Sequence, residues 1–252
     1  MYFCIAKNTY MGCYQDDVII LDSAGDNYFN ITGELAKHLP ILLNEEFKLV
    51  NNVYMPVNKI PETYNREIVS TLVHSFKEKG FIQEVETRSP CILSQPLMKG
   101  GLVGYRWDTK SALAPFGRTS KLDILSSLCT LYKVHTHIKN GLGQVIDEVI
   151  SQRDPDREYR VPSEAEIIKL SDAVDSACTL YFKKVYCLGW AATFTIEALK
   201  KGWCCNFVIG AQSIPFYAHA WAEIENKVIN DSPHVQQYLT ILLRKPFGPM
   251  GA

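Results

Sequence analysis

The sequence predicts an α+β protein built from two parts, with interleaved strands and helices first and helices followed by strands later. Three observations support this prediction: short apolar runs between turn residues near the N-terminus, a middle segment rich in Pro and Gly without periodicity, and periodic helical segments afterwards. We therefore expect one domain at residues 1–84, a linker or irregular segment at 85–120, and a second domain at 121–252.

The first 84 residues predict three short strands and two helices. The strands are expected at Tyr2–Lys7, Val18–Asp22 and Tyr28–Ile31, separated by turn-forming residues. One helical pattern covers Gly33–Asn44, where Pro40 is expected to kink or shorten the helix, and a clearer one covers Pro61–Lys79. Three strands with a few helices make a winged-helix-like arrangement.

The second part predicts four helices followed by three strands. The helices are expected at Lys121–Ile138, Gln144–Ser151, Ser163 to about Phe182, and Leu188–Lys201. Ser163 and Glu166 have the spacing of a capping box at the start of the third helix. The strands are expected at Cys204–Ile209, Tyr217–Ile224 and Val228–Asp231.

Composition excludes several classes of protein. The net charge is −1, so no overall field draws the chain to nucleic acid. The start lacks the features of a signal peptide, and the uncharged stretch 202–222 is interrupted by polar residues and Pro215, so a cytoplasmic protein without a membrane span is expected. The eight cysteines have no CxxC spacing, and His135 and His137 point to different faces of a helix, so neither disulfides nor a metal site is expected.

Three residues of the second part form a candidate thiol site. Cys187 precedes an apolar helix, whose free N–H groups and dipole stabilise a thiolate and could hold an oxyanion. His219 lies in the strand AHAWAEI, and Asp231 ends the strand that returns after a turn at Glu225-Asn226. A three-residue loop centred on residue 225, or a two-residue loop with a bulge, would place His219 opposite Asp231, about 5 Å apart at Cβ. The pattern predicts nucleophile, base and orienting carboxylate, although a buried thiol, a core histidine and a turn aspartate would look the same.

Residues 185–233 resemble the transglutaminase-like, papain-like cysteine peptidase domain of lasso-peptide maturation B proteins. The family's pattern is matched at Cys187-Leu188, Val208-Ile209-Gly210, Pro215-Phe216, His219-Ala220-Trp221 with Glu223, and Asn230-Asp231. The chain departs from it after the cysteine, where many relatives have Arg-Ser and this chain has Gly189-Trp190-Ala191. The resemblance implies a catalytic triad of Cys187, His219 and Asp231 that needs no cofactor, and leaves the lining on the substrate side open.

Residues 1–84 resemble, in the order and length of their elements, the leader-recognition element that fused members of this family carry. Such an element binds the leader peptide as an added strand beside its third strand and against its last helix. Two sets of leader-binding residues are therefore implied: Tyr28, Phe29, Asn30 and Ile31 on the strand, and Val69, Leu72, Val73 and Phe76 on the helix. The same apolar residues would also serve as the core of a small domain. DNA binding is not expected, because the helix has no basic face.

The resemblance implies a leader peptidase of lasso-peptide biosynthesis. The protein would bind the leader of a precursor peptide and cut it from the core, and an asparagine-synthetase-like, ATP-dependent lasso cyclase would then close the ring. Two alternatives stay open. In a transglutaminase-type acyl transferase an amine would intercept the thioester, and a non-catalytic scaffold would bind the precursor and deliver it to the cyclase.

Overall fold

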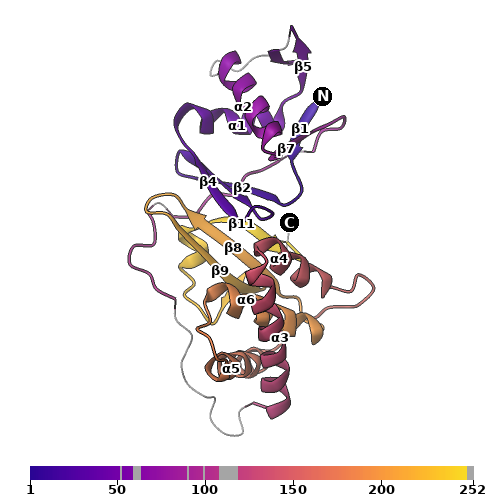
Figure 1. The fold of residues 1–252 in the computed structure, drawn as a ribbon, viewed down its shortest axis with the longest axis vertical. Coiled ribbons are helices and arrows are strands. Elements are labelled where there is room, and N and C mark those ends of the chain that lie inside the picture. Colours follow the sequence, from indigo (N-terminus) through magenta and orange to yellow (C-terminus); the bar gives the residue numbers. More distant parts are fainter. Residues whose placement is uncertain (52, 59–63, 90, 99, 108–118, 249–252) are drawn as a thin grey trace. The chain divides into compact units, whose positions relative to one another are not determined.

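The structure is a computed structural model, and it describes all residues except 52, 59–63, 90, 99, 108–118 and 249–252. The chain divides into two compact units, Met1–Pro96 and Leu97–Ala252, and each is described by itself (Figure 1). Both units combine helices with antiparallel sheets, which confirms the predicted α+β class.

The first unit contains short strands around two helices. Its described elements are β1 (Tyr2–Ile5), β2 (Thr9–Tyr14), β3 (Asp17–Asp22), β4 (Asn27–Ile31), α1 (Gly33–Asn44), β5 (Phe47–Val50), β6 (Val53–Pro56), α2 (Arg66–Glu78) and β7 (Ile82–Val85). β3 is the middle strand of the sheet β2-β3-β4, while β1 pairs with β7 and β5 with β6. Among the described strands β4 pairs with β3 alone, so β4 is an edge of its sheet.

One apolar core holds the first unit together. Ile20 of β3, Leu39 and Leu42 of α1, and Val69 and Val73 of α2 are almost fully buried in it. Spacings of three and four residues place the helical members on one face of each helix. Such burial is worth about 1.5–3 kcal/mol for each large aliphatic side chain, so the α2 stripe is needed for folding.

The secondary structure of the first unit was predicted in part. The strands expected at 18–22 and 28–31 correspond to β3 and β4, and the helix expected at 61–79 is observed from Arg66, with 61–63 outside the described residues. Side-chain capping by Asn65 explains the start of this helix, since its Oδ1 accepts from two backbone N–H groups. The helix predicted at Gly33–Asn44 is confirmed with these bounds as α1, so Pro40, which lies inside it, does not shorten it. The strands β2, β5, β6 and β7 were not predicted.

The second unit places helices against one four-stranded sheet. Its described elements are α3 (Lys121–Lys139), α4 (Leu142–Ser151), α5 (Glu164–Leu180), α6 (Cys187–Lys200), β8 (Asn206–Gln212), β9 (Tyr217–Ile224), β10 (Lys227–Ile229), α7 (Val235–Tyr238) and β11 (Thr240–Lys245). The strand order is β10-β9-β8-β11. α6 packs against β9 and β8, and α3 and α5 pack against α6 (Figure 1). This packing brings the start of α6 to β9.

Element boundaries in the second unit follow local chemistry. The predicted capping box at the start of α5 is confirmed, because Ser163 and Glu166 exchange side-chain and backbone hydrogen bonds. The strand expected at 204–209 is observed slightly later as β8, and the one expected to reach Asp231 ends at Ile229 as β10. α7 and β11 were not predicted.

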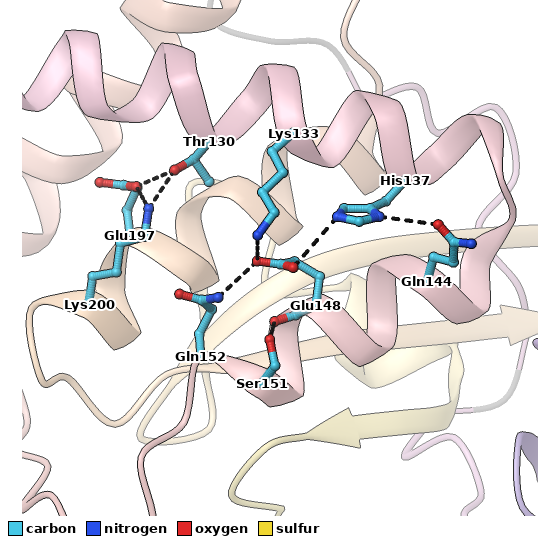
Figure 2. Close-up of polar contacts among 9 residues, drawn as sticks. All are labelled: Thr130, Lys133, His137, Gln144, Glu148, Ser151, Gln152, Glu197 and Lys200. Carbon is cyan, nitrogen blue, oxygen red and sulfur yellow. Dashed lines mark hydrogen bonds and ion pairs between the residues drawn. The ribbon is translucent and has the colours of Figure 1, made fainter.

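Polar contacts join the helices of the second unit to one another (Figure 2). Glu197 of α6 is almost fully buried, and its Oε1 accepts from Thr130 of α3 at 2.5 Å and from Lys200 at 2.8 Å. Since a buried carboxylate is costly without such partners, these contacts define how α3 lies on α6. Glu148 of α4 accepts from Lys133 of α3 at 2.8 Å in an exposed pair that joins α3 to α4.

The segment predicted as a linker, 85–120, makes specific contacts where it is described. In the first unit, the side chain of Asn44 bonds the backbone of Cys91 in both directions, and the N–H of Cys13 donates to the carbonyl of Ser94 at 2.8 Å. The residues from Leu97 onward belong to the second unit. The domain limits at 84 and 121 stay predictions, but the described residues between them are attached to the two units.

Candidate active site

Cys187 is the first residue of α6, and the helix start shapes its surroundings. The preceding residue, Tyr186, provides no side-chain cap, so the N–H groups of the first turn are not satisfied by a capping side chain. The backbone N–H groups of Leu188 and Ala220 donate to the sulfur. A half-buried thiol at a helix N-terminus with two N–H donors is in the setting that favours its thiolate form.

His219 lies on β9 and is almost fully buried. Its Nε2 is 2.6 Å from Oδ2 of Asp231, and its ring also hydrogen-bonds the thiol of Cys187. Because Nε2 faces the carboxylate, Nδ1 is the nitrogen left for the thiol. The structure therefore brings the three predicted residues together in the order thiol, imidazole, carboxylate.

The electrostatics of the pair favour charge separation. Burial acts to raise the pKa of Cys187, but the hydrogen bond and charge of His219, with the two N–H donors, outweigh it and bring the pKa below its ordinary value. Burial acts to lower the pKa of His219, but Asp231 and Cys187 together raise it to about 9. Between the two pKa values the pair exists as thiolate and imidazolium, which is the reactive form of a nucleophilic cysteine.

Asp231 reaches His219 through a two-residue turn and a break in the strand that follows it. The β9–β10 hairpin turns through Glu225 and Asn226, both with positive φ, and pairs Val228 with Glu223. Of the two predicted loops, the three-residue one is therefore wrong and the two-residue one is observed, and continued regular pairing would turn Asp231 away from His219. β10 instead ends at Ile229, and Asn230 adopts a left-handed conformation with φ of 54°, so that the chain turns Asp231 towards His219.

Aromatic rings enclose the imidazole on β9. Tyr217 and Trp221, two residues before and after His219, lie nearly parallel to its ring, at centroid distances of 5.9 and 6.0 Å. Alternation along the strand puts the three rings on one face of the sheet. Trp107 adds a tilted ring at 6.5 Å. These contacts restrict the ring plane of the imidazole.

Two buried carboxylates, Glu223 and Asp175, fix side chains that surround the candidate site. Glu223 accepts from the indole N–H of Trp221 at 2.8 Å and is paired with Arg244 through two hydrogen bonds. Asp175 of α5 accepts from the indole N–H of Trp190 at 2.6 Å and from the amide of Asn230 at 3.2 Å. Asp175 thus ties α6 to the residue that turns Asp231 into place.

A cleft of about 430 Å³ opens beside the sulfur of Cys187. Among the described residues, its lining combines aromatic rings with two cations and no carboxylate: Tyr105, Arg106, Trp107, Lys184, Tyr186, Cys187, Tyr217 and Ala218. A larger groove of about 550 Å³, between α5 and the β9–β10 hairpin, has no cysteine or histidine among the described residues that line it. The candidate triad therefore lies beside the smaller cleft.

The residues expected to bind a leader peptide lie in two different environments. Tyr28, Phe29 and Ile31 of β4 are half-buried and Asn30 is exposed, on the edge strand of the β2-β3-β4 sheet. The four expected on α2, by contrast, are between 0 and 3% exposed: Val69, Leu72, Val73 and Phe76. Their burial assigns them to the core of the first unit, because their side chains have no free surface.

The described residues contain no group of three or more His, Cys, Asp or Glu side chains placed to hold a metal ion. His137 instead contacts Gln144 and Glu148 (Figure 2), and His135 packs against Tyr181. Within the described ranges, each helix is too short or too polar to cross a bilayer.

Sequence patterns missed several residues around the site. Tyr105, Trp107 and Asp175 lie 126, 112 and 55 positions from the residues they contact, which are Asp231, His219 and Asn230. Patterns among neighbouring residues do not predict contacts between residues so far apart in the sequence. The left-handed turn at Asn230 could have been predicted, because Asn tolerates this conformation better than most residues.

Comparison with known proteins agrees with the motifs. Residues 131–244 match the family model of the transglutaminase-like superfamily. The microcin J25-processing protein McjB of Escherichia coli is 28% identical over 104 residues, which are 41% of this chain. These residues span 49% of the length of McjB. A search of solved structures gave no match. The resemblance to lasso-peptide maturation B proteins is thereby confirmed, over part of the chain.

Proposed function

We propose that this chain is a cysteine peptidase that removes the leader from a precursor peptide in lasso-peptide biosynthesis. The observation that carries the proposal is the hydrogen-bonded series Cys187, His219 and Asp231 beside an open cleft, with the thiol pKa lowered and the imidazole pKa raised. Its location in a transglutaminase-like domain, with similarity to a microcin-processing protein, indicates the kind of substrate.

The geometry supports a two-step thiol mechanism. The Cys187 thiolate would attack the scissile carbonyl carbon, and N–H groups of the first turn of α6 would stabilise the oxyanion. His219 would then protonate the departing amine of the core peptide, which leaves the leader as a thioester on Cys187. Water, deprotonated by His219, would hydrolyse the thioester, release the leader as a carboxylic acid and regenerate the thiolate. Asp231 would keep the imidazolium oriented throughout.

The first unit would hold the leader while the second unit cuts. Its exposed feature suited to this role is the β4 edge, where an extended peptide could add as a fourth strand through backbone hydrogen bonds. The α2 residues would act indirectly, by fixing that helix from within the core. A leader held on the same chain raises the local concentration of the scissile bond, so the cleft itself needs little selectivity.

The product chemistry implies a partner. Cleavage frees the α-amine of the core peptide, and closing a lactam ring with that amine requires activation of a side-chain carboxylate. The partner proposed for this step is the asparagine-synthetase-like, ATP-dependent lasso cyclase.

Cleavage of a precursor peptide, sought as a short open reading frame beside the gene, tests the proposal. Wild-type protein is expected to produce leader acid and free core, detected by mass spectrometry, and Cys187→Ala is expected to produce none. Cys129→Ala is the matched control, because Cys129 is exposed on α3 outside the cleft. Cleavage by Cys187→Ala at the wild-type rate would refute the mechanism.

The same reaction separates the alternatives. An amide adduct of the leader in the presence of added amine, instead of the acid, would identify an acyl transferase. Precursor binding without cleavage, with the cyclase and ATP present under reducing conditions, would identify a scaffold.

Hydrogen exchange tests the proposed leader site. Addition of leader peptide is expected to protect backbone amides within Asn27–Ile31, whereas core peptide alone should not. Protection confined to other elements of the first unit would exclude strand addition at β4.

A further inference from the structure

A short segment ahead of the family-model match lies against the site. This segment, called the strap, comprises the described residues of 97–107. The N–H of Met98 donates to the carbonyl of Gln237 at 2.9 Å. The side chain of Gln212, which is fully buried at the end of β8, accepts from the N–H of Leu102 at 2.7 Å and donates to its carbonyl at 3.2 Å. The strap is therefore attached to the sheet by paired bonds.

Tyr105 of the strap contacts the triad directly. Its hydroxyl donates to Oδ1 of Asp231, while the other carboxylate oxygen faces His219. Its ring also meets the imidazole edge-on, with centroids 5.8 Å apart. Tyr105 thus touches both the orienting carboxylate and the base.

Asp231 needs such a contact because the sheet does not hold it. β10 ends at Ile229, and Asn230 turns the chain out of the strand. Among the residues that the structure describes, the donor to the Asp231 carboxylate besides His219 and Tyr105 is the N–H of Ser232 at 2.6 Å. Because Ser232 follows Asp231 directly in the sequence, its N–H moves with Asp231. It therefore restrains the carboxylate less than a donor from a distant segment would.

We propose that Tyr105 is a positioning residue, and that the strap is an integral part of the active site that extends the triad to Cys187–His219–Asp231–Tyr105. Tyr105 fixes the carboxylate so that it holds the imidazolium in line with the thiolate. The kinetic consequences rest on the proposed peptidase function, whereas the effect on His219 can be measured without substrate.

Each segment that packs around the imidazole of His219 contributes titratable or charged groups. Cys187 approaches from α6, Asp231 from beyond β10, Tyr105 from the strap and Tyr217 from β9, while Arg106 and Lys184 line the cleft. Burial and the Asp231 carboxylate raise the pKa of Tyr105 well above its ordinary value, so its hydroxyl keeps its proton and stays a donor.

The test is an NMR titration of His219 in the full chain, labelled at histidine Cε1 and assigned with His219→Ala. In the wild type the imidazolium is expected to lose its proton near pH 9. Tyr105→Phe is expected to lower this pKa by roughly one unit, a tenfold change in proton affinity, because the carboxylate loses a restraining hydrogen bond. Tyr132→Phe removes an exposed hydroxyl on α3 and should leave the titration unchanged.

The sign of the change in the pKa of His219 shows whether Tyr105 acts by positioning the Asp231 carboxylate or by withdrawing charge from it. If the hydroxyl merely withdrew charge from a fixed carboxylate, Tyr105→Phe would raise the pKa of His219, and an unchanged or higher pKa would overturn the proposal. In an Asp231→Asn background Tyr105→Phe should have no further effect. An equal drop in both backgrounds would show that Tyr105 does not act through Asp231.

Activity and folding are measured on the same variants. We expect Tyr105→Phe to lower kcat about tenfold with little change in KM, provided that the chain is a peptidase. If Tyr105→Phe does not fold, Gln212→Met replaces it: this uncharged variant loses the bonds to Leu102 and Pro215, and it should lower the pKa of His219 in the same direction. A wild-type titration in folded Gln212→Met would count against the strap.

Discussion

Gly210 allows a quantitative test of how tightly the site is packed. It lies on β8 directly opposite His219 of β9. A Cβ at this position would be 2.7 Å from Cη2 of Trp221 and 3.1 Å from Cβ of Leu239. The first distance is roughly 1 Å shorter than an ordinary carbon contact. Trp221 cannot retreat freely, because it is buried and its indole N–H is bonded to Glu223.

We therefore expect Gly210→Ala to destabilise the second unit by about 2 kcal/mol, within the range for overpacked cores. For a unit of this size, that corresponds to a midpoint of thermal unfolding lowered by roughly 4–8 °C. Because the displaced ring is stacked on His219, precursor cleavage should slow as well.

Gly189→Ala is the matched control on α6. Its Cβ would meet Cγ1 of Val185 at 3.2 Å, a side-chain atom that can shift, and alanine in a helix gains roughly 0.5–1 kcal/mol over glycine. Its stability should equal or exceed that of the wild type by calorimetry. If Gly210→Ala melts within 1 °C of the wild type and cleaves at the same rate, the reasoning about Trp221 is refuted.

Three further predictions concern charge at the site. First, kcat/KM for precursor should fall above about pH 9 as the imidazolium of His219 loses its proton, and a plateau to pH 10 would contradict the raised pKa. Second, Arg244→Met should cost about 3 kcal/mol in urea denaturation because it leaves the buried Glu223 carboxylate unpaired, whereas a loss under 1 kcal/mol would show that water solvates it. Third, the double change Arg106→Glu and Lys184→Glu should raise KM for acidic more than for neutral substrates, and equal effects on both would exclude a charge preference of the cleft.

The sequence predicted which residues come together at the candidate site better than it predicted the turn that brings them together. Cys187 at a helix start and His219 in a strand follow from local periodicity, which is the part of a fold that neighbours in sequence decide. The contact between His219 and Asp231 was expected from either of two loops, one of three residues and one of two residues with a bulge. The turn has two residues, and the left-handed Asn230 restores the contact.

Some elements could not be predicted from the sequence because residues far away in the chain determine their conformation. β7 is four residues long and pairs with β1 some 80 residues earlier, so its conformation is set by its partner. The strap has no period at all, and its bonds to Gln212 join residues 110 positions apart. The stripe of α2 was recognised as apolar, but only the structure shows that the first unit buries all of it.

Differences in pKa among the free cysteines should allow Cys187 to be labelled selectively. Burial, as the main cause, raises the thiol pKa of Cys13, Cys91, Cys178, Cys204 and Cys205, whereas that of Cys187 is lowered. A mild electrophile at slightly acidic pH should therefore label Cys187 well ahead of these five. With the exposed Cys129 and the partly exposed Cys4 replaced by serine, an iodoacetamide dye would then count competent sites in a preparation, and a peptide electrophile shaped for the cleft would report which sequences enter it.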